Sequence, residues 1–377
     1  FADITDNKER AARKALAYLK SAKDPKHFMR EAQRLVANNL PLKLATLAFF
    51  LACEVVLMGG FTRITDSGLG CPDWPGCFGN MVMTTDTETI TYLQERYPEI
   101  HVAAHKGWIE MIHRYIAGGL GLLILALAFL GYREREKTAN YPYLLSLVLL
   151  GLVIVQGAFG AFTVTLKLLP NIVTLHLIGG LIIVSTLMYL RHRLKRLALG
   201  DSRSIRMRTP VMIGIALLFA QMILGGWVST NYAGWACPGI LSCAPGGAEV
   251  NYDFQAGFHL FPEVGPNYEG GQLEHGARAA IQMVHRVGAL VVTVYWLGLL
   301  WSLVKQGVLA SRKAMHFVGL LAAQIGFGYA NVVYAVPDSL AFIHHALGVL
   351  MLLYAWSIAY ATAVEYEEVS YVSVKHA

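Results

Sequence analysis

Eight apolar stretches, each long enough to cross about 30 Å of hydrocarbon, constrain this chain more than any other feature. They occupy residues 40–60, 107–131, 143–164, 172–190, 210–230, 279–303, 316–336 and 340–363. Of the 377 residues, 55% are hydrophobic and only 15% are charged, which argues against an ordinary soluble domain. The sequence predicts an all-α integral membrane protein with eight transmembrane helices.

The distribution of Lys and Arg predicts how these helices are oriented. Positive charge gathers before the first span and in the connections 133–137, 191–208 and 305–313. The long loops 61–106 and 231–278 carry few Lys and Arg, and cytoplasmic loops are the positive ones. We therefore expect both termini in the cytoplasm and the long loops on the outward side, in a bacterial periplasm or an equivalent space. The net charge of +6 reflects this asymmetry and does not indicate nucleic-acid binding.

The chain contains an internal repeat. The stretch GGFTRITDSGLGCPDWPGC, residues 59–77, shares its skeleton with GGWVSTNYAGWACPGILSC, residues 225–243. EMIHR at 110–114 corresponds to QMVHR at 282–286, and QGAFG at 156–160 corresponds to QIGFG at 324–328. A histidine follows each of these glutamines by twenty residues, so every landmark recurs at an offset of 166 to 172 residues.

This repeat predicts two tandem four-helix bundles related by a pseudo-twofold axis along the membrane normal. Each copy holds an even number of spans, so both enter the membrane in the same direction. We expect halves at 40–190 and 209–363, joined by a basic cytoplasmic linker at 191–208. Residues 1–39 read as an amphipathic cytoplasmic segment lying on anionic lipid, and 364–377 form a cytoplasmic tail.

Each half carries two intramembrane histidines on even-numbered spans, at a shared depth of roughly 10 Å. They are His113 and His176 in the first half, and His285 and His344 in the second. Histidine inside a membrane is costly without a partner, and a flat haem takes one axial ligand from each side. The pairs predict two bis-histidine haem sites; a structural hydrogen bond is the alternative for any single histidine. The adjacent His345 is ambiguous, but the glutamine-to-histidine spacing selects His344.

Two arginines and one acid accompany the histidines. Arg114 and Arg286 each follow a histidine and are candidates for pairing with haem propionates, with snorkelling to lipid phosphate as the alternative. Glu110 stands three residues before His113, where the second half has Gln282. A carboxylate can exchange protons and an amide cannot, so the first half is predicted to be reactive and the second an electron relay.

Two alternatives accompany the assignments of acidic residues. Glu110 could instead be a satisfied carboxylate paired with Arg114 or Lys106. Glu54, inside the first span, has no counterpart in the second half, and it is a secondary catalytic candidate or a buried hydrogen-bond partner.

Four of the five cysteines lie in the two outward loops, where disulfides are permitted. We expect the pairs Cys71–Cys77 and Cys237–Cys243, each closing a small loop. A thiol-redox role for these pairs is the alternative to a structural one. Cys53 lies inside the first span and is expected to be an inert packing residue.

Taken together, several motifs resemble the haem A synthase family, close to its proteobacterial members. They are GGFTRITDSGLGCPDWPGC, EMIHR, TLHLIGG, the second cysteine pair, QMVHR and FIHH. The resemblance covers residues 40–363. It implies an eight-helix enzyme that oxidises the C8 methyl group of haem O to the formyl group of haem A by successive hydroxylations.

The resemblance also implies a role for each histidine pair. His285 and His344 would ligate a haem b cofactor. His113 and His176 would hold the iron of the substrate haem O, with Glu110 beside it as the catalytic residue. The site for haem O would open sideways to lipid to admit its farnesyl tail, and the disulfide loops would cover the two sites.

Two other functions are compatible with four membrane histidines. One is a di-haem electron-transfer protein of the quinol or ferric reductase type, and the other is a haem carrier or chaperone. The electron-transfer protein does not account for the difference between Glu110 and Gln282. The expected partners are the substrate haem, membrane lipid, a haem O synthase and an electron acceptor or donor, and a homo-oligomer is compatible with the pattern.

Overall fold

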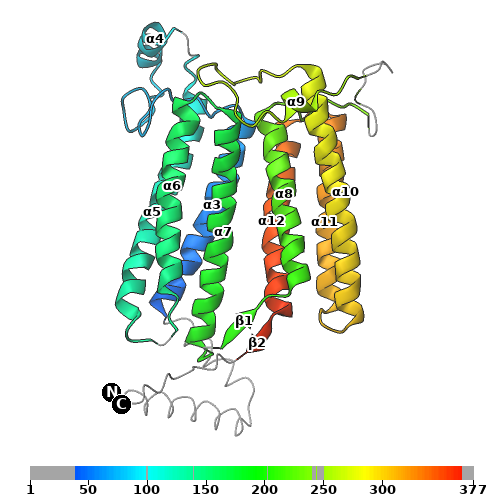
Figure 1. Cartoon of the computed structure of the whole chain (residues 1–377). Helices are drawn as coiled ribbons and strands as arrows, with labels where there is room; N and C mark the ends of the chain where they lie inside the picture. The colour runs from blue at the N-terminus through cyan, green and yellow to red at the C-terminus, as the bar shows by residue number, and fades with distance from the viewer. Residues whose placement is uncertain are drawn as a thin grey trace, which may run out of the picture.

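The computed structural model describes residues 39–98, 101–138, 140–201, 203–239, 243 and 250–366. It contains the eight predicted membrane-spanning helices (Figure 1). They are α3 (Leu40–Ile64), α5 (Ala104–Glu134), α6 (Tyr143–Thr165), α7 (Pro170–Ala198), α8 (Thr209–Thr230), α10 (His275–Lys305), α11 (Ser311–Val333) and α12 (Asp338–Thr362). The prediction of an all-α multi-pass membrane protein is confirmed.

The eight helices form two rings of four with the same order of contacts. In the first ring, α3 packs against α5 and α7, and α6 closes the ring between α5 and α7. In the second, α8 packs against α10 and α12, and α11 closes the ring between them. Figure 1 shows the first ring beside the second, with the axes of the membrane-spanning helices roughly aligned. The duplicated sequence thus folds into two equivalent bundles.

The two bundles meet through α7 against α8 and α3 against α12. In each contact, the first helix of one bundle meets the fourth helix of the other, as a twofold axis between the bundles requires. One apolar core runs through both bundles, with fully buried side chains such as Leu181 in the first and Leu352 in the second. Because lipid is as apolar as these side chains, close packing rather than exclusion of water holds the helices together.

Helix ends follow local sequence signals. The side chain of Asn39 accepts from the backbone N–H of Leu42 at 3.0 Å and caps α3. Proline occupies the first turn of α3, α7 and α8, where its missing N–H costs no hydrogen bond. α11 ends at Val333, three residues before the predicted boundary, because Ala335 and Val336 adopt positive φ angles. α7 continues to Ala198, so the start of the predicted linker 191–208 is helical.

Both ends of the bundles carry small additional elements. On one side, the short strand β1 (Ser204–Arg206) after α7 pairs antiparallel with β2 (Val364–Tyr366) after α12. On the other side lie the long loops with α4 (Thr87–Arg96) and α9 (Phe254–Gly257). The loops contain the disulfides Cys71–Cys77 and Cys237–Cys243, so both predicted pairs are confirmed.

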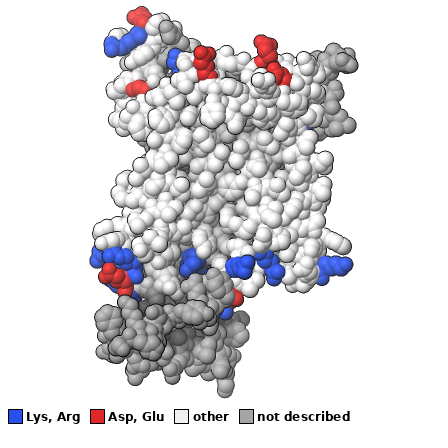
Figure 2. Space-filling model, viewed as in Figure 1, with Lys and Arg blue, Asp and Glu red and all other residues white. Residues whose placement is uncertain are grey.

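Charged side chains separate along the membrane axis. Figure 2 shows a broad band without Lys, Arg, Asp or Glu across the middle of the face in view, and a row of mostly Lys and Arg along the end that carries β1 and β2. This is the pattern expected of a cytoplasmic edge. The cytoplasmic placement of the termini stays a prediction, and the N-terminal segment before residue 39 and the tail after residue 366 lie outside the described residues.

Candidate functional site

The first bundle brings its two predicted histidines close together. His113 projects from α5 and His176 from α7, and their ring centroids lie 6.5 Å apart with the planes at 81°. Nδ1 of His113 is buried and has no hydrogen-bond partner among the described residues. Two helices that are not neighbours in sequence, α5 and α7, therefore each direct one imidazole toward the same space inside the first bundle.

The second bundle carries its two predicted histidines on the corresponding helices, His285 on α10 and His344 on α12, and both helices pack against α8 and α11. Nδ1 of His344 lies 3.1 Å from the backbone carbonyl oxygen of Gln324. Because a carbonyl oxygen only accepts, Nδ1 carries the hydrogen and Nε2 keeps its lone pair. For His344 this is the tautomer that a metal-ligating histidine needs. Nδ1 of His176 and Nδ1 of His285 instead each accept from a glutamine amide.

Three glutamines contact these histidines. The side-chain amide of Gln156 lies 3.0 Å from Nδ1 of His176, and the amide of Gln221 lies 3.0 Å from Nδ1 of His285. The amide of Gln324 lies 3.3 Å from Nε2 of His344. At the first-half position equivalent to Gln221, the chain has Val55, which explains why His113 lacks a side-chain partner.

The contacts of these glutamines give them a role that the sequence alone did not indicate. The twenty-residue spacing to His176 and His344 marked Gln156 and Gln324 as parts of the repeat without giving them a function. Gln221 stands four residues before Gly225, and its partner His285 is 64 residues further along the chain. Only the folded ring shows that α8 and α10 bring them together.

Glycines open the space that the imidazoles occupy. A Cβ atom on Gly59 would lie 3.0 Å from the ring of His113, and one on Gly225 would lie 3.3 Å from the ring of His285. On Gly328 it would lie 2.9 Å from the ring of His344. The Gly pair that opens each repeat is therefore explained by a ring packed against helix backbone.

The donor set fits a haem better than a bare metal ion. Two imidazoles that share one metal through bonds of about 2 Å have centroids roughly 6 Å apart, close to the separation in the first bundle. No group of three or more metal-binding side chains occurs in the described part of the chain. A pair of histidines suits a porphyrin, which carries its own equatorial nitrogens.

Glu110 lies at the outer end of α5, one turn before His113, and is only 4% exposed. Its carboxylate accepts a hydrogen bond from the backbone N–H of Cys71 at 2.9 Å and pairs with the guanidinium of Arg114. The sequence had offered Arg114 as one of its two alternative partners. The first disulfide loop is thereby attached to the helix that carries His113.

Gln282, the counterpart of Glu110 in the second bundle, is also buried but makes weaker contacts. It donates to the backbone carbonyl of Gly234 at 3.2 Å, and its Oε1 has no partner among the described residues. The two halves therefore differ in charge at equivalent buried positions. This is the asymmetry that the repeat predicted.

Arg114 and Arg286, the two predicted partners of haem propionates, donate hydrogen bonds to backbone carbonyls of the disulfide loops. The Arg114 guanidinium donates to the carbonyl of Asp73 at 2.9 Å and to Gly76. The Arg286 guanidinium donates to the carbonyl of Cys237 at 2.6 Å. Both arginines thus hold a disulfide loop over their own histidine, and pairing with propionates stays a prediction.

Glu54 belongs to neither histidine site. It is exposed on the outer face of α3, in line with the exposed Leu47 and Phe50. The alternative of a buried hydrogen-bond partner is therefore wrong, because this side chain faces the lipid.

A polar cluster at the outer ends of α3 and α8 joins the two bundles. Nη2 of Arg63 donates to the Ser229 carbonyl at 2.5 Å, and its Nη1 pairs with Asp66 at 2.9 Å. The guanidinium also lies 4.2 Å from the centre of the Tyr232 ring. Burial raises the pKa of the Tyr232 hydroxyl, which stays protonated and donates to Asp66 at 2.8 Å.

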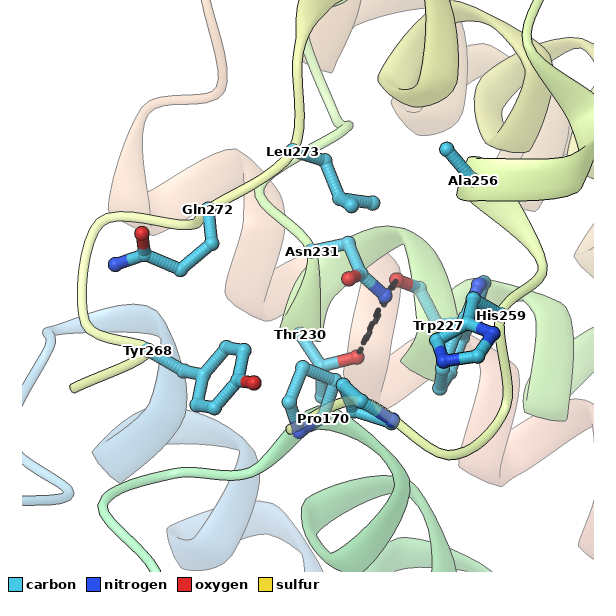
Figure 3. A pocket seen from close by; sticks show the side chains of 10 residues that line it. Pro170, Trp227, Thr230, Asn231, Ala256, His259, Tyr268, Gln272 and Leu273 are labelled. Carbon is cyan, nitrogen blue, oxygen red and sulfur yellow. Dashed lines mark hydrogen bonds between the residues drawn. The ribbon is translucent and has the colours of Figure 1, made fainter. Parts of the chain in front are cut away.

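A surface hollow lies close to this cluster, above the start of α7 and the end of α8. Figure 3 shows the residues that line it. Thr230 is the last residue of α8 and Asn231 follows it, and both face Tyr268 and Gln272 of the loop before α10. Asn231 donates to the carbonyl of Trp227 at 3.0 Å. The lining includes none of the four membrane histidines, so the hollow belongs to the contact between the halves.

Comparison with known proteins agrees with this geometry. Residues 43–356 match the family model described as "Cytochrome oxidase assembly protein". The chain belongs to this family. A relative named "Heme A synthase" from Shewanella oneidensis is 38% identical over 317 residues, which cover 84% of this chain and 94% of the relative.

More distant members of the family carry the same name. "Heme A synthase" from Paramagnetospirillum magneticum is 30% identical, with 81% of this chain and 88% of the relative covered. The protein of that name from Rhizorhabdus wittichii is 27% identical, with 83% and 90% covered. The family match spans both bundles and all four histidines, as the resemblance in sequence implied.

Proposed function

We propose that this protein is a haem A synthase, an enzyme that oxidises the C8 methyl group of haem O to the formyl group of haem A. Successive hydroxylations of the methyl carbon give a geminal diol, which loses water. The observation that carries the proposal is the duplicated histidine pair with a buried carboxylate beside only one copy. The names of the relatives supply the substrate.

The two bundles have separate tasks in this proposal. His113 and His176 of residues 40–190 hold the iron of haem O, and His285 and His344 of residues 209–363 hold a haem b. That cofactor would supply a redox centre for passing electrons between the substrate and an external acceptor or donor. The support is chemical, because Gln221 and Gln324 contact the second pair and the position equivalent to Glu110 is the amide Gln282.

Glu110 is the residue that we assign to proton movement in the first bundle. Its carboxylate exchanges protons near the reacting methyl group, while Arg114 and the Cys71 N–H hold it in place. The disulfide loop above it keeps bulk water away from the site. The chain would lie in a bacterial inner membrane with both sites toward the periplasm, the side of the disulfides.

The experiment is co-expression of this chain with a haem O synthase, followed by extraction and chromatography of the haems. The proposal predicts haem A, and the matched control is the same cells with the His113→Ala variant, which should retain haem O. A di-haem electron-transfer protein or a haem carrier would leave haem O unchanged in both, and that result would contradict the proposal.

A further inference from the structure

His345, the residue after His344 on α12, lies at the junction of the two bundles. Its Nε2 donates to the backbone carbonyl of Val56 on α3 at 3.1 Å. Gly60, one turn further along α3, provides the space, because a Cβ atom there would overlap the His345 ring. A partly buried imidazole of the second bundle is therefore inserted against the backbone of the first.

The same contact exists on the other side of the pseudo-twofold axis, with a different residue. The position after His176 on α7 is Leu177, and it packs against Gly226 of α8, where a Cβ would lie 2.8 Å from Leu177 Cδ2. The second glycine of each pair, Gly60 or Gly226, therefore contacts the side chain at the equivalent position of the other bundle. Leucine can only pack, whereas histidine also donates a hydrogen bond.

This difference matters for the orientation of the neighbouring ligand. Successive residues of an α-helix project about 100° apart, so a rotation of α12 that moved His345 off Val56 would also turn His344. The bond between Nδ1 of His344 and the carbonyl of Gln324 depends on the same rotation. In the first bundle, Leu177 sets no such directional restraint on α7 and His176.

We propose that His345 is a positioning residue for His344: its hydrogen bond to the Val56 carbonyl fixes the rotation of α12, so that the second bundle holds its haem permanently. The first bundle, with Leu177 at the equivalent place, is left free to take up substrate and release product. This inference rests on the proposed function, because it assumes a resident haem between His285 and His344.

The test uses the purified holoprotein in detergent and measures how fast its low-spin haem passes to excess apomyoglobin. His345→Leu, which copies Leu177, should lose the second-bundle haem about 10-fold faster, as expected when a partner that orients a metal ligand is removed. Its electron paramagnetic resonance g-values should change as well. His345→Gln keeps a donor and should restore both properties toward the wild type.

Gly60→Ala tests the same contact without touching His345, because the new methyl group displaces the ring. It should reproduce the His345→Leu phenotype, and the double variant should be no worse than either single variant. Gly319→Ala on α11, where a Cβ meets nothing within 4 Å, is the matched control and should behave as wild type. If His345→Leu does not accumulate, Gly60→Ala carries the test.

Wild-type haem retention and unchanged g-values in His345→Leu, or in Gly60→Ala, would overturn the inference. Failure of the proposed function would look different, since the wild-type chain would then make no haem A while the retention rates could still be compared.

Discussion

The replacement of Glu110 by Gln tests the chemical role of the first bundle. It removes one charge and one proton site while keeping the size of the side chain, and it copies the residue that the second bundle has at this place. In the wild type, the Cys71 N–H donates to the Glu110 carboxylate at 2.9 Å, and the amide oxygen of Gln can still accept this hydrogen bond. The pairing with Arg114 loses its charge.

This change can lower stability or turnover, and the two effects differ in their expected magnitude. Loss of a hydrogen bond to a charged group costs about 1.5–3 kcal/mol of stability, which lowers the amount of folded protein but not the turnover of what remains. Loss of a group that transfers protons in the reaction lowers turnover by about 10²- to 10⁴-fold. We expect at least a 100-fold fall in haem A formed per folded protein, by the same reasoning.

The assay is the haem A to haem O ratio in cells that also express a haem O synthase, divided by the amount of folded protein. The low-spin spectrum of the second bundle should persist, because Glu110 lies in the other ring. Gln282→Ala is the matched control and should change turnover little. Unchanged turnover per folded Glu110→Gln protein would remove this carboxylate from the mechanism.

Two further predictions address the second haem site and the junction between the halves. His344→Ala should abolish the low-spin haem spectrum of the purified protein, whereas His113→Ala should retain it; loss of the spectrum in His113→Ala alone would mean that the halves are assigned backwards. Arg63→Ala removes the bond to the Ser229 carbonyl and the pairing with Asp66, and should lower the free energy of unfolding by about 2 kcal/mol in thermal denaturation. Arg63→Lys should recover only part of this loss, and an unchanged melting temperature in Arg63→Ala would show that the cluster does not hold the bundles together.

The architecture followed from the sequence because two strong periodic signals agreed. Apolar length marked each span, and the repeat placed His113 and His285 on equivalent helices. Apolar length is a local signal, and the repeat is found by comparing the sequence with itself, so neither depends on the details of packing. The duplication predicted that both bundles have the same contacts, and the fold confirms this, because α3 contacts α7 as α8 contacts α12.

The sequence was less informative where a contact joins distant parts of the chain. Nothing near Gln221 indicates that it meets His285, and nothing near His345 indicates that it meets Val56, 289 residues away. The expectation that Glu54 could be a buried hydrogen-bond partner was wrong for a related reason. An acid in an apolar stretch suggests burial, but which side of α3 faces lipid depends on how the whole ring packs.

Substrate and cofactor should occupy different histidine pairs. An experimental structure of the purified protein saturated with haem O would test this directly, because the farnesyl tail distinguishes haem O from haem b. We expect the farnesylated haem between His113 and His176 and the other haem between His285 and His344. A farnesylated haem between His285 and His344 would contradict it.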